Sequence, residues 1–374
     1  MKFAGIYIHV PFCDKKCNYC DYYSLENRKS YIDVFIKMLQ REIEITAEKF
    51  DKDWIFDTIY FGGGTPALLP SKKLDEILNK LNNQFNTAEC LEVTLEINPD
   101  ETTQNKLLSF KKLGVNRLSI GFQSLEPELL HTLSRTHNPD DCNLIYNLAR
   151  DSGFDNISID MLYNIPGQSV ESWLQNLAAV TALQPDHIAT YPLIIDEIAP
   201  FNLQVKSGEF SLLSEEIEQN MFIRGSQFLR ENGYIQYEIA HFSQLGKECK
   251  HNLHYWNLEP YLAFGPSAHS YDGVKRWWNN SSIDAYLISL SNNEIPPYGF
   301  ETLNAIQHYN EKIIWGLRTK QGIHIDMLQN IDIKSRFKSI LKKWENSLEI
   351  SNKTIRIKSG HYYLAEEITA DMMI

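Results

Sequence analysis

Cysteine is scarce in this sequence, with six residues among 374, which argues against a fold built on a disulfide framework. No run of about 18 apolar residues is present, so the sequence predicts no membrane-spanning helix. The first ten residues, MKFAGIYIHV, lack the pattern of a secretory signal peptide. We therefore expect a cytoplasmic protein whose thiols stay reduced.

Positive charge is also in deficit, because 36 Lys and Arg face 48 Asp and Glu, for a net charge of -12. This balance disfavours a general nucleic-acid binder, and we expect no nucleic-acid partner. One segment differs: residues 331–360 hold eight basic and three acidic residues, a net of 8 - 3 = +5. We interpret it as a solvated helix face and hairpin rather than an anion-binding patch.

The first half of the chain alternates β-rich runs with amphipathic stretches, which predicts βα units and a parallel sheet. Glycines follow two helical patterns where helices should stop, at Gly114 and Gly153. The expected strands are Gly5–Val10, Thr58–Phe61, Glu92–Ile97, Arg117–Gly121, Asn156–Leu162 and His187–Tyr191. The expected helices include Tyr31–Phe50, Ser71–Asn82, Glu101–Leu113 and Val170–Leu183. Six units form a curved, incomplete (β/α)6 barrel, since a complete barrel takes eight.

The alternation of strands and helices ends after Asp196. A helix over Glu215–Glu231 and a short strand over Gln236–Ala240 lead into a loop-rich, aromatic segment that ends near Pro297. We expect a smaller α+β region here.

The last part of the chain changes character again, with two helical patterns before two short strands. They are Thr302–Thr319, Lys334–Leu348, Thr354–Lys358 and His361–Leu364, the strands being joined at Ser359-Gly360. Helices followed by a hairpin predict a winged-helix-like domain. The expected domains are 1–225, 226–297 and 298–374, which agrees with the two or three suggested by length.

The unusual residues of the first half follow the ends of the expected strands. In a parallel barrel these ends share one mouth, where chemistry gathers. The features that meet there are the Cys13–Cys20 loop, FGGGTP over 61–66, Glu96, Gln123-Ser124, Asp160 and Tyr191.

Three of the six cysteines, Cys13, Cys17 and Cys20, lie within eight positions. A disulfide would leave one thiol over, and a structural zinc site would need a fourth ligand. The nearest candidate for that ligand, Asp21, adjoins Cys20 and is poorly placed to complete a tetrahedron. Three thiolates also suit an iron–sulfur cluster, with one iron left open for another ligand. We favour the cluster.

A Cys-x3-Cys-x2-Cys motif after a first strand resembles the radical SAM superfamily. In that family the open iron of a 4Fe–4S cluster chelates S-adenosylmethionine, and an electron from the cluster cleaves it to a 5′-deoxyadenosyl radical. Gly63, Gly64 and Thr65 fit the loop that approaches the methionine amino group, because glycines let the backbone come close to a ligand. Taken alone, the glycine run would indicate only a tight turn.

The whole chain resembles the branch of this family that holds oxygen-independent coproporphyrinogen III dehydrogenase and a heme chaperone. The matching stretches are YIHVPFC, FGGGTP, GVNRLSIGFQS, LSRTH, IDMLYNIPGQ and FGPSAHS. The resemblance implies S-adenosylmethionine contacts from Tyr7, Tyr19, Gly63, Gly64, Thr65, Glu96, Gln123, Arg135 and Asp160. Glu96 or Asp160 can accept from ribose hydroxyls or an ammonium group, and Arg135 can pair with a carboxylate.

Three features favour the chaperone over the dehydrogenase. The dehydrogenase pattern has a further cysteine two positions beyond the third ligand, where this chain has Tyr22. It also has a long N-terminal segment, whereas only twelve residues precede Cys13 here. The segment HNLHYW over 251–256 matches a motif, HNxxYW, that is associated with the chaperone.

Heme needs an axial ligand and flat apolar walls. The resemblance implies His251 as the ligand, with His254, three positions on, as a weaker candidate. Cys249 is a thiolate candidate, although an isolated cysteine more often packs in a core. We interpret Cys90 and Cys142 as structural.

The leading hypothesis is therefore a heme chaperone that binds a 4Fe–4S cluster, S-adenosylmethionine and heme. The resemblance implies acceptor hemoproteins of the respiratory chain as partners, and it allows a homodimer and peripheral membrane association. The first alternative is the dehydrogenase, which converts coproporphyrinogen III by radical oxidative decarboxylation. The second is a radical SAM enzyme that acts on RNA or another macromolecule.

Overall fold

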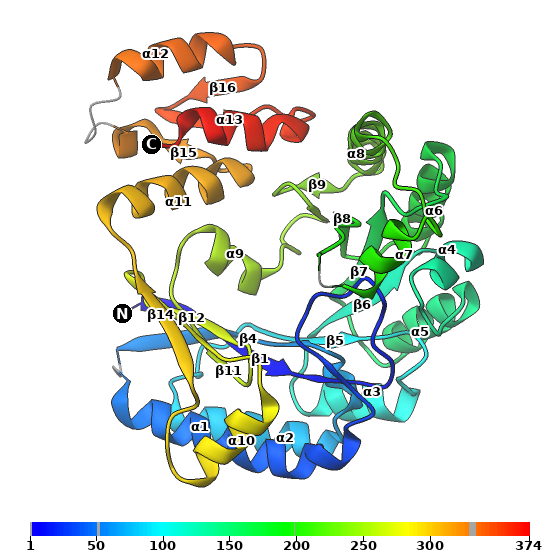
Figure 1. Cartoon of the computed structure of the whole chain (residues 1–374), viewed down its shortest axis with the longest axis vertical. Coiled ribbons are helices and arrows are strands. Elements are labelled where there is room, and N and C mark those ends of the chain that lie inside the picture. Colours follow the sequence, from blue (N-terminus) through cyan, green and yellow to red (C-terminus); the bar gives the residue numbers. More distant parts are fainter. Residues whose placement is uncertain (1, 51–52, 198, 329–333) are drawn as a thin grey trace.

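The computed structural model describes residues 2–50, 53–197, 199–328 and 334–374. Its main feature is a 12-stranded sheet in the order β14-β13-β12-β11-β1-β4-β5-β6-β7-β8-β10-β9. The sheet curves around a concave side that faces the centre of the molecule (Figure 1). Its two ends, β14 and β9, are not paired with each other, so the barrel stays open. The predicted incomplete barrel is thus confirmed.

All neighbouring strands from β11 to β8 run parallel. Their bounds are β1 Lys2–Val10, β4 Trp54–Gly63, β5 Glu92–Ile97, β6 Arg117–Gln123, β7 Ile157–Tyr163, β8 His187–Pro192 and β11 Tyr261–Phe264. Each of the six strands expected from the sequence is present: β5 has the expected bounds, β7 is shifted by one residue, and the other four are extended at one or both ends. Their continuous apolar character reflects burial of both faces of a parallel sheet.

The helices between these strands cover the convex face (Figure 1). They are α1 Ile32–Lys49, α2 Ser71–Gln84, α3 Gln104–Lys112, α4 Pro127–Thr132, α5 Pro139–Asp151 and α6 Val170–Ala182. In β1 the residues Ala4, Ile6 and Ile8 belong to the apolar core beneath them. Because side chains alternate along a strand, Tyr7 and His9 project to the concave side. Polar residues on that side therefore line a shared space.

The segment after α6 packs back on the barrel through α7 Pro200–Lys206 and α8 Glu215–Glu231. The indole nitrogen of Trp173, on α6, donates a 3.1 Å hydrogen bond to the carbonyl of Met221, on α8. A Cβ at Gly225 would lie 2.5 Å from that nitrogen, so glycine permits the close approach of the two helices.

The central region differs from the expectation. It is not mainly loop, because it extends both ends of the main sheet with antiparallel strands and adds two helices. These elements are β9 Ile235–Gln236, β10 His241–Ser243, α9 Lys250–Trp256, β12 His269–Tyr271, β13 Lys275–Asn279, α10 Ile283–Ser291 and β14 Tyr298–Thr302. The expected strand Gln236–Ala240 was placed wrongly: it covers the turn between β9 and β10. In that turn the backbone amide of Ala240 donates to the buried Glu238 carboxylate instead of pairing in a ladder.

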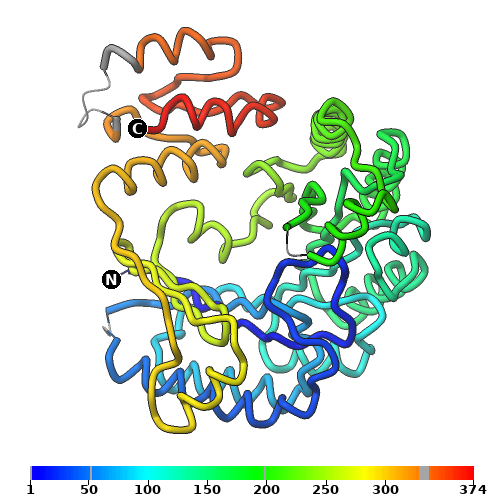
Figure 2. The backbone as a smooth tube through the Cα atoms, in the orientation of Figure 1, coloured from blue at the N-terminus to red at the C-terminus, as the bar shows by residue number. Residues whose placement is uncertain are grey.

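The C-terminal part has its own apolar core and a three-stranded antiparallel sheet, in the order β15-β17-β16. Its elements are α11 Ala305–Arg318, β15 Ile323–His324, α12 Lys334–Lys343, β16 Leu348–Ser351, β17 Thr354–Ile357 and α13 Ala365–Met372. Helices around a small sheet fit the expected winged-helix-like architecture. This part is orange to red in Figure 2, where it lies apart from the blue and cyan barrel strands. The domain boundaries stay a prediction.

The expected hairpin at Ser359-Gly360 is wrong. The strands pair instead around Asn352 and Lys353, which both have positive φ, and Tyr362–Leu364 forms a short 3-10 helix. The basic segment 331–360 lies partly outside the described residues, so its interpretation as a helix face stays a prediction. Among the described helices, none has the length and apolar character that crossing a membrane requires.

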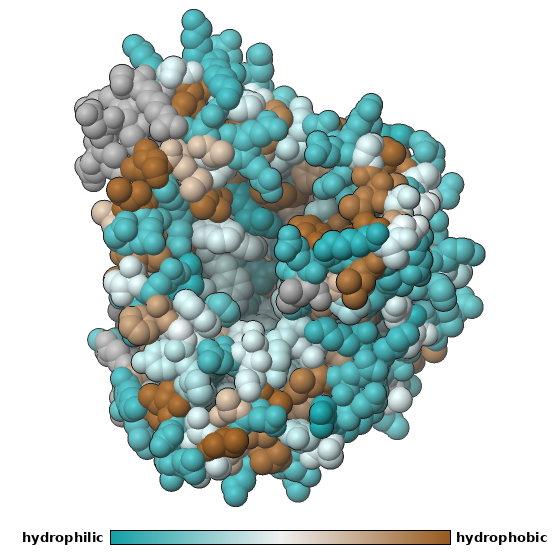
Figure 3. Space-filling view, in the orientation of Figure 1, coloured by the Kyte–Doolittle hydropathy of each residue, from teal (hydrophilic) through white to brown (hydrophobic). Residues whose placement is uncertain are grey.

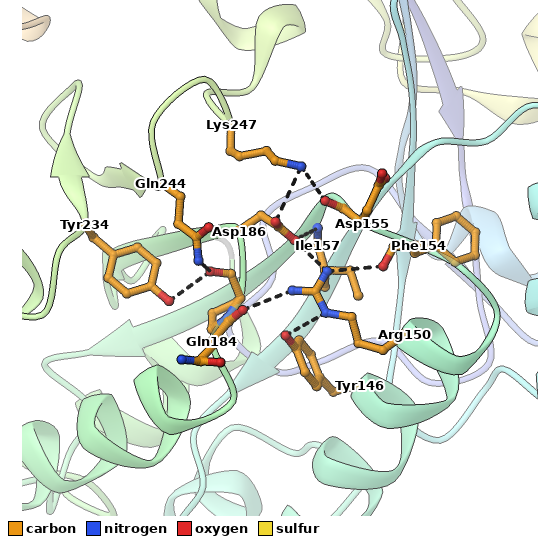
Figure 4. Close-up of polar contacts among 11 residues, drawn as sticks. Tyr146, Arg150, Phe154, Asp155, Ile157, Gln184, Asp186, Tyr234, Gln244 and Lys247 are labelled. Carbon is orange, nitrogen blue, oxygen red and sulfur yellow. Dashed lines mark hydrogen bonds and ion pairs between the residues drawn. The ribbon is translucent and has the colours of Figure 1, made fainter.

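An ion-pair cluster, defined here as Arg150, Asp186 and Lys247, joins three elements on the barrel exterior (Figure 4). Asp186, just before β8, accepts from Arg150 Nη1 at 2.7 Å and from the backbone amide of Ile157 at 2.9 Å. Lys247 Nζ lies 3.5 Å from the other carboxylate oxygen. This cluster ties α5 and the loop before α9 to the start of β8.

Candidate functional site

The cysteine loop leaves the C-terminal end of β1. The short strand β2, Phe12–Cys13, pairs in parallel with β3, Leu25–Glu26, and so closes the loop. Within it, the amide of Cys20 donates a 3.2 Å hydrogen bond to the carbonyl of Cys17. Cys13, Cys17 and Cys20 are free thiols of intermediate burial. The structure thus places them together at the predicted mouth.

Two side chains from other loops contact these sulfurs. Thr65 Oγ1 donates to Cys13 Sγ at 3.8 Å, and Arg135 Nη1 donates to Cys17 Sγ at 3.5 Å. Burial raises the pKa of the Cys13 thiol, and it raises the pKa of Cys20 to about 11. The thiols of Cys13 and Cys20 are therefore protonated at neutral pH, and binding of a metal cluster must release those protons.

In the described part of the chain, no three His, Cys, Asp or Glu side chains converge as a single metal ion requires. A four-iron cluster makes a different demand, because each thiolate binds a different iron and the sulfurs stand further apart. Besides burial, the nearby sulfurs of Cys17 and Cys13 also raise the pKa of Cys20. The cysteine loop therefore fits a cluster better than it fits a mononuclear site.

The glycine loop packs directly on the start of the cysteine loop. The amides of Gly64 and Thr65 donate to the carbonyls of Val10 and Phe12, at 2.8 and 2.7 Å. A Cβ at Gly64 would lie 2.6 Å from the Phe12 carbonyl oxygen, and Gly63 has a φ of 109°. Both positions require glycine, and the backbone they expose lies beside the thiols. This geometry fits a ligand bound next to a cluster.

Arg135 lies in the loop between α4 and α5, and its side chain reaches the end of β5 and a carbonyl of β6. Besides its bond to Cys17, Nη2 donates to Asn98 Oδ1 at 2.7 Å and to the Gly121 carbonyl at 3.0 Å. Asn98 donates in turn to Thr65 Oγ1 at 3.0 Å. Asn98 thus connects the guanidinium to the glycine loop, a role that the sequence analysis missed. Its position two residues after Glu96 on the same strand face was the available signal.

Two carboxylates face the concave side from β5 and β7. Burial raises the pKa of Glu96 to about 7, and the charge of Asp160 adds to the shift. Glu96 accepts a 2.9 Å hydrogen bond from the Tyr60 hydroxyl. Burial also raises the pKa of Asp160, although Ser119 and Ser158 donate to it at 3.0 to 3.1 Å. The carboxylates are suited to accept from hydroxyl or ammonium groups of a ligand.

The remaining candidates lie around the same space. Tyr7 lies on β1 with its hydroxyl 3.2 Å from His9 Nδ1 and its ring 6.1 Å from that of Tyr60. Tyr19 packs on a small apolar cluster beside the cysteine loop. Gln123 ends β6 with a φ of 66°, next to a register shift. Positive φ in a non-glycine residue is a strained conformation that is enriched at functional sites.

His251 lies beside Tyr7, with the ring centroids 6.4 Å apart. It is fully buried on α9, and its ring stacks on Tyr60 at 5.2 Å. Its Nδ1 lies 2.9 Å from Thr58 Oγ1, and its Nε2 lies 2.8 Å from the Tyr255 hydroxyl. Burial lowers its pKa well below the usual value. In this conformation neither ring nitrogen is open to a metal.

His254 is held between two carboxylates, with Nε2 2.8 Å from Asp57 and Nδ1 2.7 Å from Glu259. Burial lowers its pKa, but the two hydrogen bonds outweigh burial and raise the pKa to about 9. The ring is therefore protonated at neutral pH and donates from both nitrogens. A protonated imidazole does not bind iron.

The other cysteines have packing or hydrogen-bonding roles. Cys249 begins α9, where its thiol donates to Glu92 Oε1 at 3.5 Å. Glu92 also accepts from the amides of Lys250 and His251, at 3.0 and 3.1 Å, and so caps the helix. Cys142 lies in the main core, and Cys90 donates to a backbone carbonyl.

Comparisons with known proteins agree with this site. Residues 7–179 match the family model described as the radical SAM superfamily, which covers the cysteine loop, the glycine loop and both carboxylates. The fold also resembles the solved structure of coproporphyrinogen III oxidase (HemN) from Escherichia coli. The TM-score is 0.85, over 99% of this chain and 90% of that one, at 21% identity. At that identity the likeness concerns the fold alone.

Curated relatives are closer in sequence. The heme chaperone HemW of Mycobacterium tuberculosis is 31% identical over 327 residues, which are 87% of this chain and 84% of that protein. The heme chaperone HemW of Bacillus subtilis is 32% identical over 318 residues, 85% of this chain and 84% of that one. The chain belongs to the HemW family of radical SAM proteins. This family implies a 4Fe–4S cluster and S-adenosylmethionine.

Proposed function

We propose that this protein is a heme chaperone, which binds heme and delivers it to acceptor hemoproteins, among them those of the respiratory chain. The likeness to proteins named heme chaperone HemW, across 87% of the chain, carries the proposal. In it, Cys13, Cys17 and Cys20 hold a 4Fe–4S cluster. S-adenosylmethionine lies between the glycine loop and the Glu96 and Asp160 carboxylates. The cluster and its ligand supply electron-transfer and radical chemistry when bound.

Tyr22 supports the chaperone over the dehydrogenase. The dehydrogenase pattern has a cysteine at this position, two residues beyond the third cluster ligand. The Tyr22 side chain is 64% exposed, and the charges of Glu96 and Asp160 reach its hydroxyl. A phenol therefore stands at the barrel opening in place of that thiol.

The concave side offers room for a large ligand. The surface is hollowed at the centre of the molecule, between the C-terminal part and the helices that follow the barrel (Figure 3). His251 does not present its ring to this hollow, because the residue is fully buried on α9. Heme ligation by His251 would require α9 to move and to break its contacts with Thr58 and Tyr255. His251 as the axial ligand stays a prediction.

Anaerobic transfer tests the proposal. The reconstituted protein is loaded with hemin and mixed with the apo form of a respiratory b-type cytochrome, and the acceptor's absorbance is followed after separation. We expect faster transfer than from hemin-loaded serum albumin, which controls for passive release. Cys20→Ser, which lacks one cluster ligand, shows whether transfer needs the cluster.

A parallel reaction supplies coproporphyrinogen III, S-adenosylmethionine and reductant. We expect no protoporphyrinogen IX. Formation of that product would establish the dehydrogenase instead, and transfer no faster than from albumin would refute the chaperone proposal.

A further inference from the structure

Helix α9 packs against β1 and β4 on the concave side of the barrel (Figure 1). His251 Nδ1 lies 2.9 Å from Thr58 Oγ1 on β4. His254 Nε2 lies 2.8 Å from Asp57 on the same strand. A Cβ at Gly5 on β1 would lie 2.9 Å from His251 Nδ1, so glycine makes room for the imidazole. The helix is therefore fixed closely to both strands.

The C-terminal part holds α9 from its other side. The Trp256 ring lies 5.2 Å from the ring of Trp315, and the guanidinium of Arg318 lies 4.4 Å from the centre of the same indole. Trp315 and Arg318 both belong to α11. Any shift of α9 would thus break contacts on two faces.

His251 stacks on two tyrosine rings of the barrel. Tyr7 and Tyr60 lie opposite each other on β1 and β4, with ring centroids 6.1 Å apart. The His251 centroid lies 5.2 Å from that of Tyr60 and 6.4 Å from that of Tyr7, and in both pairs the ring planes are at 29°. A Cβ at Gly62 would lie 3.1 Å from each tyrosine ring, so the strand leaves no space on that side. The imidazole and the backbone therefore hold the Tyr60 ring in one orientation.

The Tyr60 hydroxyl carries this orientation to Glu96. It donates a 2.9 Å hydrogen bond to Glu96 Oε1. A hydrogen bond from the Gly63 backbone also favours the charged carboxylate, and a Cβ at Gly62 would lie 3.0 Å from Oε1. The carboxylate is thus fixed between the tyrosine and the glycine loop.

Tyr60 also favours the charged form of Glu96. Burial raises the pKa of Glu96 to about 7, and the hydrogen bond from Tyr60 is the strongest of the effects that lower it. Without this donor the carboxyl would hold its proton at neutral pH, and a protonated carboxyl is a weaker acceptor for an ammonium or hydroxyl group. The other titratable groups that face Glu96 are Tyr7 on β1, Arg117 on β6, Asp160 on β7, Tyr255 on α9 and Tyr22 after the cysteine loop.

We propose that His251 and Tyr60 are positioning residues of the S-adenosylmethionine site: His251 fixes the ring of Tyr60, whose hydroxyl holds the Glu96 carboxylate toward the ligand. The inference rests on the proposed function, in which Glu96 contacts S-adenosylmethionine. It gives α9 a role in the conformation observed, without any movement of the helix.

Double-mutant cycles on the reconstituted protein test the inference. S-adenosylmethionine is titrated anaerobically by calorimetry into the wild type, Tyr60→Phe, His251→Gln and Glu96→Gln, and into the two double variants that contain Glu96→Gln. Circular dichroism checks folding. The matched control is Tyr286→Phe, because Tyr286 also donates to a buried carboxylate, that of Glu42, at 2.6 Å, but joins α10 to α1.

Tyr60→Phe should weaken S-adenosylmethionine binding by about tenfold, since outer partners that orient the ligands of metal sites are worth that much. His251→Gln keeps a polar side chain but loses the flat ring, so it should weaken binding too. Neither change should add more than about twofold once Glu96→Gln is present, because both act through that carboxylate. Tyr286→Phe should match the wild type. Because Tyr60→Phe removes a single oxygen, it decides the matter if His251→Gln does not fold.

Wild-type S-adenosylmethionine affinity in Tyr60→Phe and His251→Gln would overturn the inference, and so would effects that add in full to that of Glu96→Gln. The hemin transfer assay on the same variants separates this failure from that of the proposed function. If affinity and transfer both stay at wild-type levels, the inference falls and the chaperone proposal stands. If His251→Gln loses hemin but keeps its S-adenosylmethionine affinity, His251 is a heme ligand instead. Absence of S-adenosylmethionine binding in the wild type would overturn this inference together with the S-adenosylmethionine site of the proposed function.

Discussion

The guanidinium of Arg135 donates a 3.5 Å hydrogen bond to the sulfur of Cys17, although 118 positions separate the two residues. The same group is fixed by Asn98 and by the Gly121 carbonyl. A positive charge is therefore held beside one ligand of the proposed cluster. Net charge and hydrogen bonds to sulfur are the main protein controls on the potential of such clusters.

Arg135→Gln should make the cluster harder to reduce. A charged hydrogen bond contributes about 1.5–3 kcal/mol, so the midpoint potential of this one-electron couple should fall by roughly 65–130 mV. The measurement is a redox titration of reconstituted protein followed by electron paramagnetic resonance. Arg135→Lys keeps the charge and should shift the potential less. An unchanged midpoint in the glutamine variant would show that the guanidinium does not act on the cluster.

Glu96 should make stability depend on pH. Its folded pKa of about 7 lies above the ordinary value of 4.5, so the folded state holds its proton more tightly than the unfolded state. The resulting stabilisation is complete below pH 4.5 and is lost as pH rises through 7. The free energy of unfolding of Glu96→Gln should therefore exceed that of the wild type by a margin that grows to about 1–3 kcal/mol between pH 5 and 8. Urea unfolding of both proteins measures this, and parallel pH curves would contradict it.

His254 should make stability depend on pH over a higher range than Glu96 does. Its folded pKa is about 9 against an ordinary 6.5, so its ion pairs with Asp57 and Glu259 contribute fully below pH 6.5 and are lost as pH rises through 9. We expect His254→Gln to cost about 2–3 kcal/mol at pH 6 and much less at pH 9.5. Chemical unfolding at the two pH values tests this. A cost that stays constant would mean that the ring is neutral.

Asp186 should contribute more to the stability of the fold than its partner Lys247. Asp186 accepts from Arg150 and from the buried amide of Ile157, so Asp186→Ala leaves that amide without its partner, removes the charge that faces Arg150, and should cost about 2–4 kcal/mol. Lys247 is a half-exposed partner, and Lys247→Ala should cost less than about 1 kcal/mol. Thermal unfolding compares the two. If both variants lost the same stability, the ion pair between Lys247 and Asp186 would account for the whole effect of Asp186.

Much of the barrel could be predicted because its strands are apolar runs between helices with clear stop signals. Each inner strand is buried on both faces, so its composition alone marks it. The strands of the central region are only two to five residues long, and some are partly exposed, as in Lys275–Asn279; such pieces lack a distinct pattern. The expected C-terminal hairpin failed because two turn signals compete there. Asn352-Lys353 joins the strands, whereas Gly360 follows them.

The candidate site was predictable to the level of residue types at strand ends. Cys13, Glu96 and Asp160 are marked by position alone, since parallel strands bring their C-terminal ends together. The interaction partners of the site residues were not predictable, because Arg135 and Cys17 lie 118 positions apart and meet only in the folded chain. The hydrogen bond that occupies His251 Nδ1 could not be predicted either, since its partner Thr58 lies 193 positions away in the sequence. Sequence can name a histidine, but only packing shows whether its nitrogens are free.

The pairing of β1 with β11 has a consequence for biosynthesis. Gly5 lies opposite Tyr261, so β1 completes one edge only with a strand that is made much later in translation. Until residues 261–264 emerge, β1 presents an unpaired apolar edge, which invites association with other chains. Pairing across such a sequence separation is slow. Wrong pairing at this edge of β1 can therefore compete with folding until the later part of the sheet has been made.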